Sequence, residues 1–160
     1  MSPKGHDTIR VINPKKLVWQ NLTGSGNKTA AHLLINDRIT IILCAFEGKP
    51  MILRIYGRAK AYHERDLEYQ KHNELFKENT GSRQIIEIDV ESVQTSCGYS
   101  ISFMDFKEER GRLNSWSKKQ GKEKIKSYWV EKKTKSIDGF KQIFHKTNKP
   151  NSYLQVKAQI

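Results

Sequence analysis

The pattern that most constrains this chain is the segment 82–96, SRQIIEIDVESVQTS, where apolar and polar residues alternate from Ile86 through Val93. Successive side chains of a strand point to opposite faces of a sheet, so the alternation predicts a half-buried β-strand. Antiparallel sheets commonly keep one face against the core and the other face in water. The segment therefore favours a mainly β fold built from antiparallel strands.

Four other segments also have the composition of strands. Segments 7–12 and 16–21 are rich in β-branched and aromatic residues and flank the turn NPKK, so they predict a hairpin. Segment 38–46, RITIILCAF, is a continuous apolar run, which predicts a strand buried on both faces with Cys44 as a small core residue. Segment 51–63 alternates again and predicts a long strand.

Three segments predict helices, namely 27–37, 64–76 and 106–133. Two glycines interrupt the predicted elements: Gly57 predicts a bend or bulge in the long strand, and Gly121 divides the last helix into two. Five strands with few helices between them do not fit a parallel doubly wound sheet. Their hairpin-like spacing predicts a single domain in which helices pack outside an antiparallel barrel.

The charge of the chain points to anionic partners. A net charge of +12 favours nucleic acid, phosphorylated ligands or an acidic membrane surface. Much of the excess lies in segment 107–135, which holds eleven Lys or Arg and four Asp or Glu.

The two cysteines, Cys44 and Cys97, match no metal-ligand spacing. With no membrane-spanning segment and no signal peptide in the sequence, these features predict a cytoplasmic protein with reduced thiols.

Segment 21–34, NLTGSGNKTAAHLL, has the residue types of a phosphate-binding turn. It is not an ATP-type P-loop, because that motif requires G-x-x-x-x-G-K-[ST]. Here Asn27 separates Gly26 from Lys28, and Asn21 stands where the first glycine belongs. The spacing therefore argues against nucleotide hydrolysis, although it leaves other phosphate sites open.

The same segment still suits an anion. The glycines allow a tight turn after a strand that ends at Asn21, and a helix then begins near Asn27 with free N–H groups and a positive dipole end. Ser25 and Thr29 add hydroxyls and Lys28 adds a charge. The alternative is a capped surface helix with a chance lysine, and this stretch alone favours neither interpretation.

A second lysine could serve the same anion. Lys4, in SPKG, lies at the head of a predicted hairpin whose return strand leads into the stretch that contains Gly24 and Gly26, here called the glycine segment. Two adjacent strands would then direct Lys4 and Lys28 at one ligand. The alternative is that Lys4 is a solvated turn lysine.

Several of these motifs together resemble one known family. SPKG, then LVWQN, then GSGNKTAAHLL followed by DRITIILCAFEGKPMILRIYGRAKAYH resembles the pyridoxamine 5'-phosphate oxidase-related family of FMN-binding split barrels. The stretch SVQTSCGYSISFMDFKEERGRL, the later W…YW helix and KSIDGF resemble the C-terminal part of one bacterial branch. The likeness runs from about Ser2 to Phe140, which implies an FMN-binding split-barrel domain at 1–140 and a C-terminal tail at 141–160.

The resemblance implies a mainly β fold, an antiparallel split β-barrel flanked by helices. It also implies a homodimer with FMN in the groove between subunits. Relatives usually carry a helix and a strand before the point that matches SPKG, so the expected barrel lacks that first helix and strand. The C-terminal arginine-and-histidine motif with which true pyridoxamine phosphate oxidases grip their substrate is absent. FMN binding is therefore expected more than vitamin B6 oxidation.

The resemblance also implies roles for individual residues. Lys4 and Lys28 would hold the FMN phosphate with hydroxyl groups from Ser25 and Thr29, and the strand under the flavin would contact the ring and the ribityl chain. His32 would help from the rim or pack within its helix. The implied cofactor-binding residues are Lys4, Trp19, Gln20, Asn21, Ser25, Asn27, Lys28, Thr29 and His32.

Two further stretches have open roles. Arg54 and Tyr56 share one face of a strand and either contribute to a partner subunit's site or lie on the barrel surface. Segment 95–99 either borders the reactive edge of the flavin, with Tyr99 stacking on substrate, or caps the barrel. No residue is identified as a general acid or base, so the catalytic residues stay unknown.

Two functions follow. The first is an FMN-dependent oxidoreductase of unknown substrate, in which the flavin supplies two-electron transfer. The alternative is a basic module that binds nucleic acid or another polyanion, supported by the net charge and by Trp116, Tyr128 and Trp129 among the lysines of the last helix. Against it, those aromatic residues fall at helical spacing and are expected to face the core.

Overall fold

A computed structural model describes residues 7–24, 27–132, 135–136 and 139–140. Lys4, Ser25 and the predicted tail at 141–160 lie outside the described residues. The strands are β1 (Ile9–Asn13), β2 (Lys16–Leu22), β3 (Arg38–Cys44), β4 (Ile52–His63) and β5 (Ser82–Ser96). The helices are α1 (Asn27–Leu33), α2 (Leu67–Asn73) and α3 (Arg112–Lys132).

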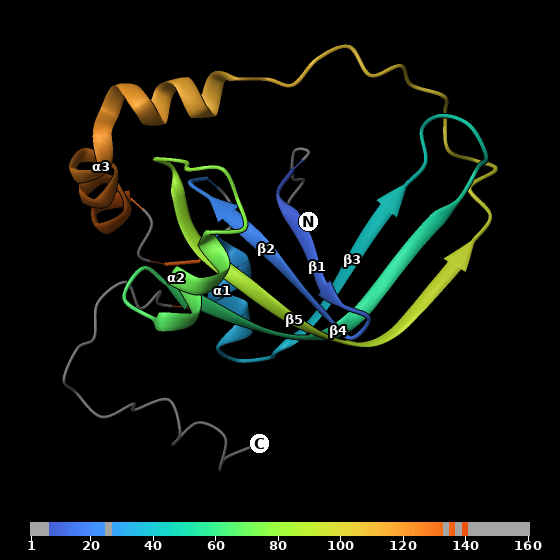
Figure 1. Ribbon diagram of the computed structural model, residues 1–160, viewed down its shortest axis with the longest axis horizontal. Helices are drawn as coiled ribbons and strands as arrows, with labels where there is room; N and C mark the ends of the chain where they lie inside the picture. Colours follow the sequence, from blue (N-terminus) through green and yellow to red (C-terminus); the bar gives the residue numbers. More distant parts are fainter. Residues whose placement is uncertain (1–6, 25–26, 133–134, 137–138, 141–160) are drawn as a thin grey trace.

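The five strands form one antiparallel sheet in the order β1-β2-β5-β4-β3. The sheet curves strongly, and the helices gather at one end of it (Figure 1). The strand that alternates most clearly in the sequence, β5, is the central one, and its Ile86 is paired with Trp19 of β2 and Ala61 of β4. The mainly β architecture with helices outside the sheet confirms the predicted fold class.

The core occupies both faces of the sheet at the helical end. On the α1 side, Trp19 packs with Ile86 and Ile88, and Leu33 of α1 covers them. On the other side, Ile85 packs with aromatic residues, of which Tyr69 belongs to α2. About half of β5 is buried, as predicted, but the buried residues do not lie along one face of the whole strand. Its first part is buried on both faces, and most of it from Asp89 onward is exposed.

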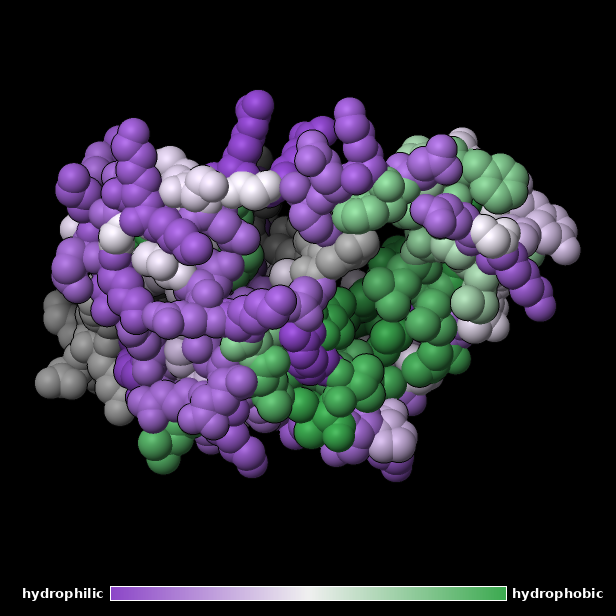
Figure 2. Space-filling model, turned by 45° about the horizontal axis from the view of Figure 1, so that its top comes forward, coloured by the Kyte–Doolittle hydropathy of each residue, from purple (hydrophilic) through white to green (hydrophobic). Residues whose placement is uncertain are grey.

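The other end of the sheet carries uncovered apolar side chains. Ile42 and Leu43 of β3 are 51% and 46% exposed, and Val93 of β5 is 57% exposed. Figure 2 shows hydrophobic side chains gathered over this end and hydrophilic ones over the α3 end. The expectation that β3 is buried on both faces, with Cys44 in the core, is wrong: β3 is an edge strand and Cys44 is exposed. Apolar composition alone does not say what covers a strand.

Both predicted glycine effects are confirmed. The β4–β5 register shifts between Tyr56 and Gly57, and a Cβ atom at Gly57 would overlap the backbone carbonyl oxygen of Asp89. Gly121 interrupts α3 with a φ of 75°, a left-handed conformation that glycine adopts at little cost. The glycine at the bulge therefore allows β4 and β5 to remain paired over their length.

The chain returns to the core through α3. After β5, residues 97–111 run back along the length of the molecule to α3, which lies at the end that holds α1 and α2 (Figure 1). In α3, Ile125 is buried, and the indole N–H of Trp129 donates to the Thr23 hydroxyl at 3.1 Å. The end of α3 is thereby fixed beside the segment that links β2 to α1. Within the described ranges, no helix has the length and apolar character needed to cross a membrane.

Candidate functional site

The link between β2 and α1 is anchored by Gly81, the residue just before β5. The Thr23 N–H donates to the Gly81 carbonyl at 2.8 Å, and the Thr23 hydroxyl donates to the same carbonyl at 2.9 Å. Gly24 follows directly, and residues 25 and 26 lie outside the described residues. Thr23, the residue before Gly24, is thus held by both its main chain and its side chain.

Helix α1 begins at Asn27, as the sequence predicts, and ends at Leu33, earlier than predicted. Lys28 is exposed in its first turn and Thr29 is half-buried beside it. The His32 side chain is exposed, and its ring meets the ring of Phe140 edge-on at 6.0 Å. The structure thus brings Lys28 and Thr29 together at the start of α1, while the Asn27 side chain is outside the description.

The three β2 residues expected near the flavin are buried and divide between the two faces of the sheet. Trp19 lies in the core on the α1 side. The Asn21 amide donates to Gln84 Oε1 at 2.8 Å. Gln20 donates to Asn73 Oδ1 of α2 at 3.1 Å and lines a separate hollow of about 270 Å³. Gln20 therefore points away from the side on which Trp19 and α1 lie.

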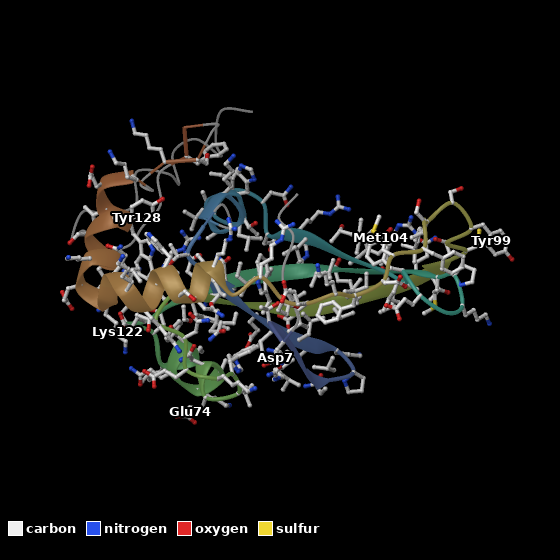
Figure 3. All side chains as sticks on the ribbon, turned by 90° about the horizontal axis from the view of Figure 1, so that it is seen from above. Asp7, Glu74, Tyr99, Met104, Lys122 and Tyr128 are labelled. Carbon is white, nitrogen blue, oxygen red and sulfur yellow. The ribbon has the colours of Figure 1, made fainter. Side chains whose placement is uncertain are left out.

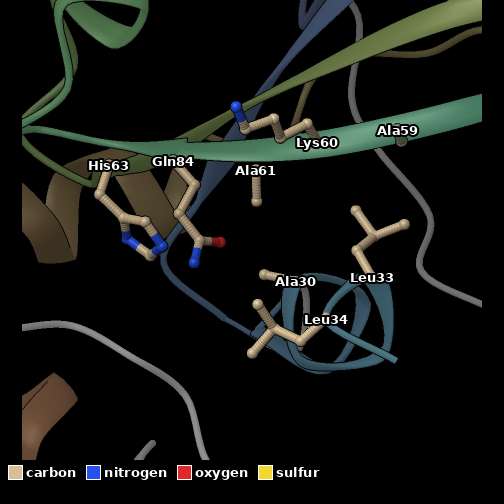
Figure 4. Close-up of a pocket in the computed structure, with 8 residues that line it drawn as sticks. All are labelled: Ala30, Leu33, Leu34, Ala59, Lys60, Ala61, His63 and Gln84. Atoms are coloured by element: carbon tan, nitrogen blue, oxygen red, sulfur yellow. The ribbon is translucent and has the colours of Figure 1, made fainter. Parts of the chain in front are cut away.

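A pocket of about 170 Å³ lies between α1 and the sheet. Figure 4 shows its eight lining residues, with Ala30, Leu33 and Leu34 from the helix below the strands. His63 at the end of β4 and Gln84 of β5 close one side of the pocket with polar groups, and the two are paired across the strands. The result is an apolar space with polar groups at one end, which is the usual composition of a small-molecule site.

Sequence reasoning did not identify the polar residues of this end. The His63 side chain is mostly buried, and burial lowers its pKa to about 4, helped by the nearby Arg65 and Arg83 and opposed by Asp66. The imidazole is therefore neutral at neutral pH. Arg83, beside Gln84 in the chain, is 2% exposed, and burial lowers its pKa to about 10, so it keeps its charge.

A bulge explains how these β5 residues are placed. The β2–β5 register shifts between Asn21 and Leu22, so that Asn21 pairs with Gln84 and Leu22 with Ser82. Ser82 accepts or donates a hydrogen bond at 3.0 Å with Tyr69 of α2, and Ile85 packs against the same helix. Ser82 and Ile85 are three positions apart and yet face the same helix, which is possible only where the alternation of side chains along the strand is broken. The break directs Arg83 towards Gly24, whose carbonyl lies 3.5 Å from Arg83 Nη1.

The remaining predicted residues lie near the opposite end of the sheet. Tyr99 is 83% exposed, and it lies at the far end from Tyr128 and Lys122 (Figure 3). Arg54 donates to the Ser96 hydroxyl at 2.6 Å, and Tyr56 donates to Gln94 at 3.2 Å. Within one chain, these residues are not brought to the α1 pocket.

A partly buried ionic cluster lies outside the pocket. Glu87 accepts from Lys16 Nζ at 2.9 Å and contacts His72 Nε2 at 2.8 Å. Burial tends to raise the Glu87 pKa, but the hydrogen bonds from Lys16 and His72 outweigh it and hold the pKa below its usual range. These contacts connect β2, β5 and α2, so the cluster has a structural role. The described part of the chain contains no group of side chains able to hold a metal ion.

Comparison with known proteins gives one informative relative. No protein-family model matches the chain. The chain is 32% identical over 109 residues, or 66% of its length, to the pyridoxamine 5'-phosphate oxidase family protein ustO of Aspergillus flavus. The match covers 44% of ustO, so the chain spans less than half the length of that curated relative.

A crystal structure of a HupZ variant from Group A Streptococcus is similar over 56% of this chain and 73% of that chain, with a TM-score of 0.44 and 15% identity. The sequence match is therefore what confirms the predicted resemblance. Over the matched residues, the chain is a relative of the pyridoxamine 5'-phosphate oxidase family, and its antiparallel sheet with outer helices is the split-barrel type of fold expected for it.

Proposed function

We propose that this protein binds FMN and works as a flavin-dependent oxidoreductase of unknown substrate in the cytoplasm. The observation that carries the proposal is the position of α1. This helix begins at Asn27, shortly after β2 ends at Leu22, and it forms one wall of the pocket that His63 and Gln84 close. The relationship to the pyridoxamine 5'-phosphate oxidase family supports a flavin as the ligand.

The residues present suit a phosphorylated, partly apolar ligand. Lys28 and Thr29 would bind the phosphate end at the start of α1, together with Lys4 and Ser25. Trp19 and Asn21 lie behind the pocket, so they would support its wall more than touch the ring. The bound flavin would supply two-electron chemistry at its N5 edge. The alanine and leucine side chains of the pocket would exclude water, and His63 would offer a neutral imidazole.

A second copy of the chain would complete the site. The pocket of about 170 Å³ is smaller than the roughly 300–1,000 Å³ of typical ligand sites. The outer parts of β3–β5 expose Ile42, Leu43 and Val93, and contiguous exposed apolar surface of this kind marks an interaction site. Residues at that end, including Arg54 and Tyr99, would then reach the flavin of the partner subunit.

The test is flavin uptake by the purified protein. We expect flavin absorbance in the visible spectrum, or tight binding of added FMN with a rise in Tm. Lys28→Glu should weaken FMN binding by about 10- to 100-fold, because it removes a charge-assisted contact to phosphate. Lys71→Glu is the matched control, because Lys71 is an exposed lysine of α2. Equal FMN affinity of the Lys28→Glu variant and the control would refute the phosphate assignment.

The polyanion alternative gains no support from α3. The indole N–H of Trp129 bonds Thr23, and the rings of Trp116 and Tyr128 contact each other edge-on at 5.6 Å. These aromatic side chains therefore make contacts within the protein itself. A salt-dependent affinity for nucleic acid that survives Lys28→Glu would reverse this preference.

A further inference from the structure

The least satisfied buried group in the described chain is the guanidinium of Arg83. The residue is 2% exposed, and its Nε and Nη2 atoms have no hydrogen-bond partner among the described residues. Its Nη1 atom lies 3.5 Å from the Gly24 carbonyl oxygen, which is at the limit of a hydrogen bond. Buried arginines normally pair with carboxylates. Besides burial, the phenol of Tyr128 influences the Arg83 pKa, but no carboxylate does.

Gln84, the next residue in the chain, also has a buried donor without a hydrogen-bond partner among the described residues. The Gln84 amide accepts from Asn21 through its oxygen, whereas its Nε2 atom is buried without a partner in the part of the chain that the structure describes. Gln84 lines the α1 pocket, and Arg83 directs Nη1 towards Gly24 at the start of the glycine segment. The unmet groups of these two residues are all donors, so they call for a ligand that only accepts.

We propose that Arg83, assisted by Gln84 Nε2, binds a phosphate group between Gly24 and the polar end of the α1 pocket. The planar guanidinium fork fits the oxygens of a phosphate, and it is less strongly hydrated than a lysine ammonium, so it suits a buried site. Arg83 and Gln84 are adjacent at a bulge that breaks the alternation of β5, a common feature next to functional sites. A phosphate in this position would satisfy donors that the fold leaves unpaired.

This inference rests on the proposed function where the phosphate is that of FMN, and it stands without it where free phosphate is the ligand. It differs from the lysine site, because Lys28 is exposed whereas Arg83 is buried. An exposed lysine mainly attracts the ligand, whereas a buried arginine discriminates between a phosphorylated ligand and the same ligand without its phosphate. Riboflavin, which lacks the phosphate, is therefore the informative competitor.

The experiment compares FMN, riboflavin and inorganic phosphate as ligands of the full chain and of Arg83→Met. Methionine keeps an unbranched apolar stem and removes the charge, so the ligand-free variant should fold and have a Tm higher by on the order of 4 °C. The preference for FMN over riboflavin should fall by about 10- to 100-fold, with riboflavin affinity unchanged. Phosphate should raise the Tm of the natural chain and not that of the variant. Arg112→Met, which removes an exposed arginine of α3, is the charge-matched control.

The possible results distinguish the Arg83 phosphate site from the proposed flavin function. An unchanged FMN preference in Arg83→Met overturns the Arg83 site and leaves FMN binding intact. Stabilisation by phosphate through Arg83 without flavin binding supports the site and overturns the flavin function. The absence of both flavin and phosphate binding overturns both. If Arg83→Met does not fold, Arg83→Lys is tested in its place. Lysine keeps the positive charge but lacks the planar guanidinium group, so the preference for FMN over riboflavin should still fall.

Discussion

Replacing His63 should make the protein less sensitive to acid. Its pKa is lowered from 6.5 to about 4, chiefly by burial at the end of the α1 pocket. Between these two values, the His63 imidazole is protonated in the unfolded chain and neutral in the folded chain. The free energy of unfolding therefore falls as the pH falls through this window. At 1.36 kcal/mol per pKa unit, the full loss is about 3 kcal/mol and is complete near pH 4. Above pH 6.5, His63 makes no contribution of this kind.

The assay is urea unfolding at several pH values between 7 and 4.5, for the natural chain and for His63→Gln. Glutamine is neutral throughout, so the variant should keep most of the stability that the natural chain loses on acidification. Glu87, whose pKa is lowered, loses its stabilising contacts only at still lower pH, and this loss is common to both proteins. Lys60→Gln, which replaces another polar side chain lining the same pocket, is the control. Parallel stability curves for the natural chain and His63→Gln would refute the buried, neutral imidazole.

Two further predictions concern the sheet. Gly57→Ala should destabilise the fold by about 3 kcal/mol, because the new Cβ overlaps the Asp89 backbone carbonyl, which cannot rotate away. Gly111→Ala meets no atom and should change the free energy of unfolding by about 0.5 kcal/mol or less, so equal effects in a denaturation series would contradict the bulge geometry. Leu43→Glu, on the exposed apolar end of β3, should convert a dimer into a monomer in light scattering, and a monomeric natural chain would argue against the dimer.

Local pattern predicted the elements well, because the period of apolar residues reflects the backbone itself. The alternation in segment 82–96 identified β5, and the glycines at 57 and 121 marked a bulge and a kink. Burial was predicted less well. The run RITIILCAF has the composition of an inner strand, but β3 lies at the edge, with much of its apolar surface uncovered. Neighbours distant in the sequence decide burial, and composition does not specify them.

The site shows the same limit. The helix start after the glycines depends on local signals, and the structure confirms that α1 begins at Asn27. In the sequence, Arg83 and Gln84 form the polar start of an alternating strand, and this pattern does not distinguish them from ordinary strand residues. Their importance depends on a register shift against β2, and a single sequence does not reveal the pairing. An arginine just before the apolar run of the central strand was the signal that could have found them.

The two ends of the sheet require different kinds of completion. At the α1 end, the unmet groups of Arg83 and Gln84 are hydrogen-bond donors in a buried setting, and apolar cover would leave them as costly as before. At the outer end, Leu43 and its neighbours need apolar contact, and an anion would do nothing for them. A ligand can therefore complete the first end and another protein surface the second. Phosphate should then stabilise the α1 end even in Leu43→Glu, because the two sites depend on different interactions.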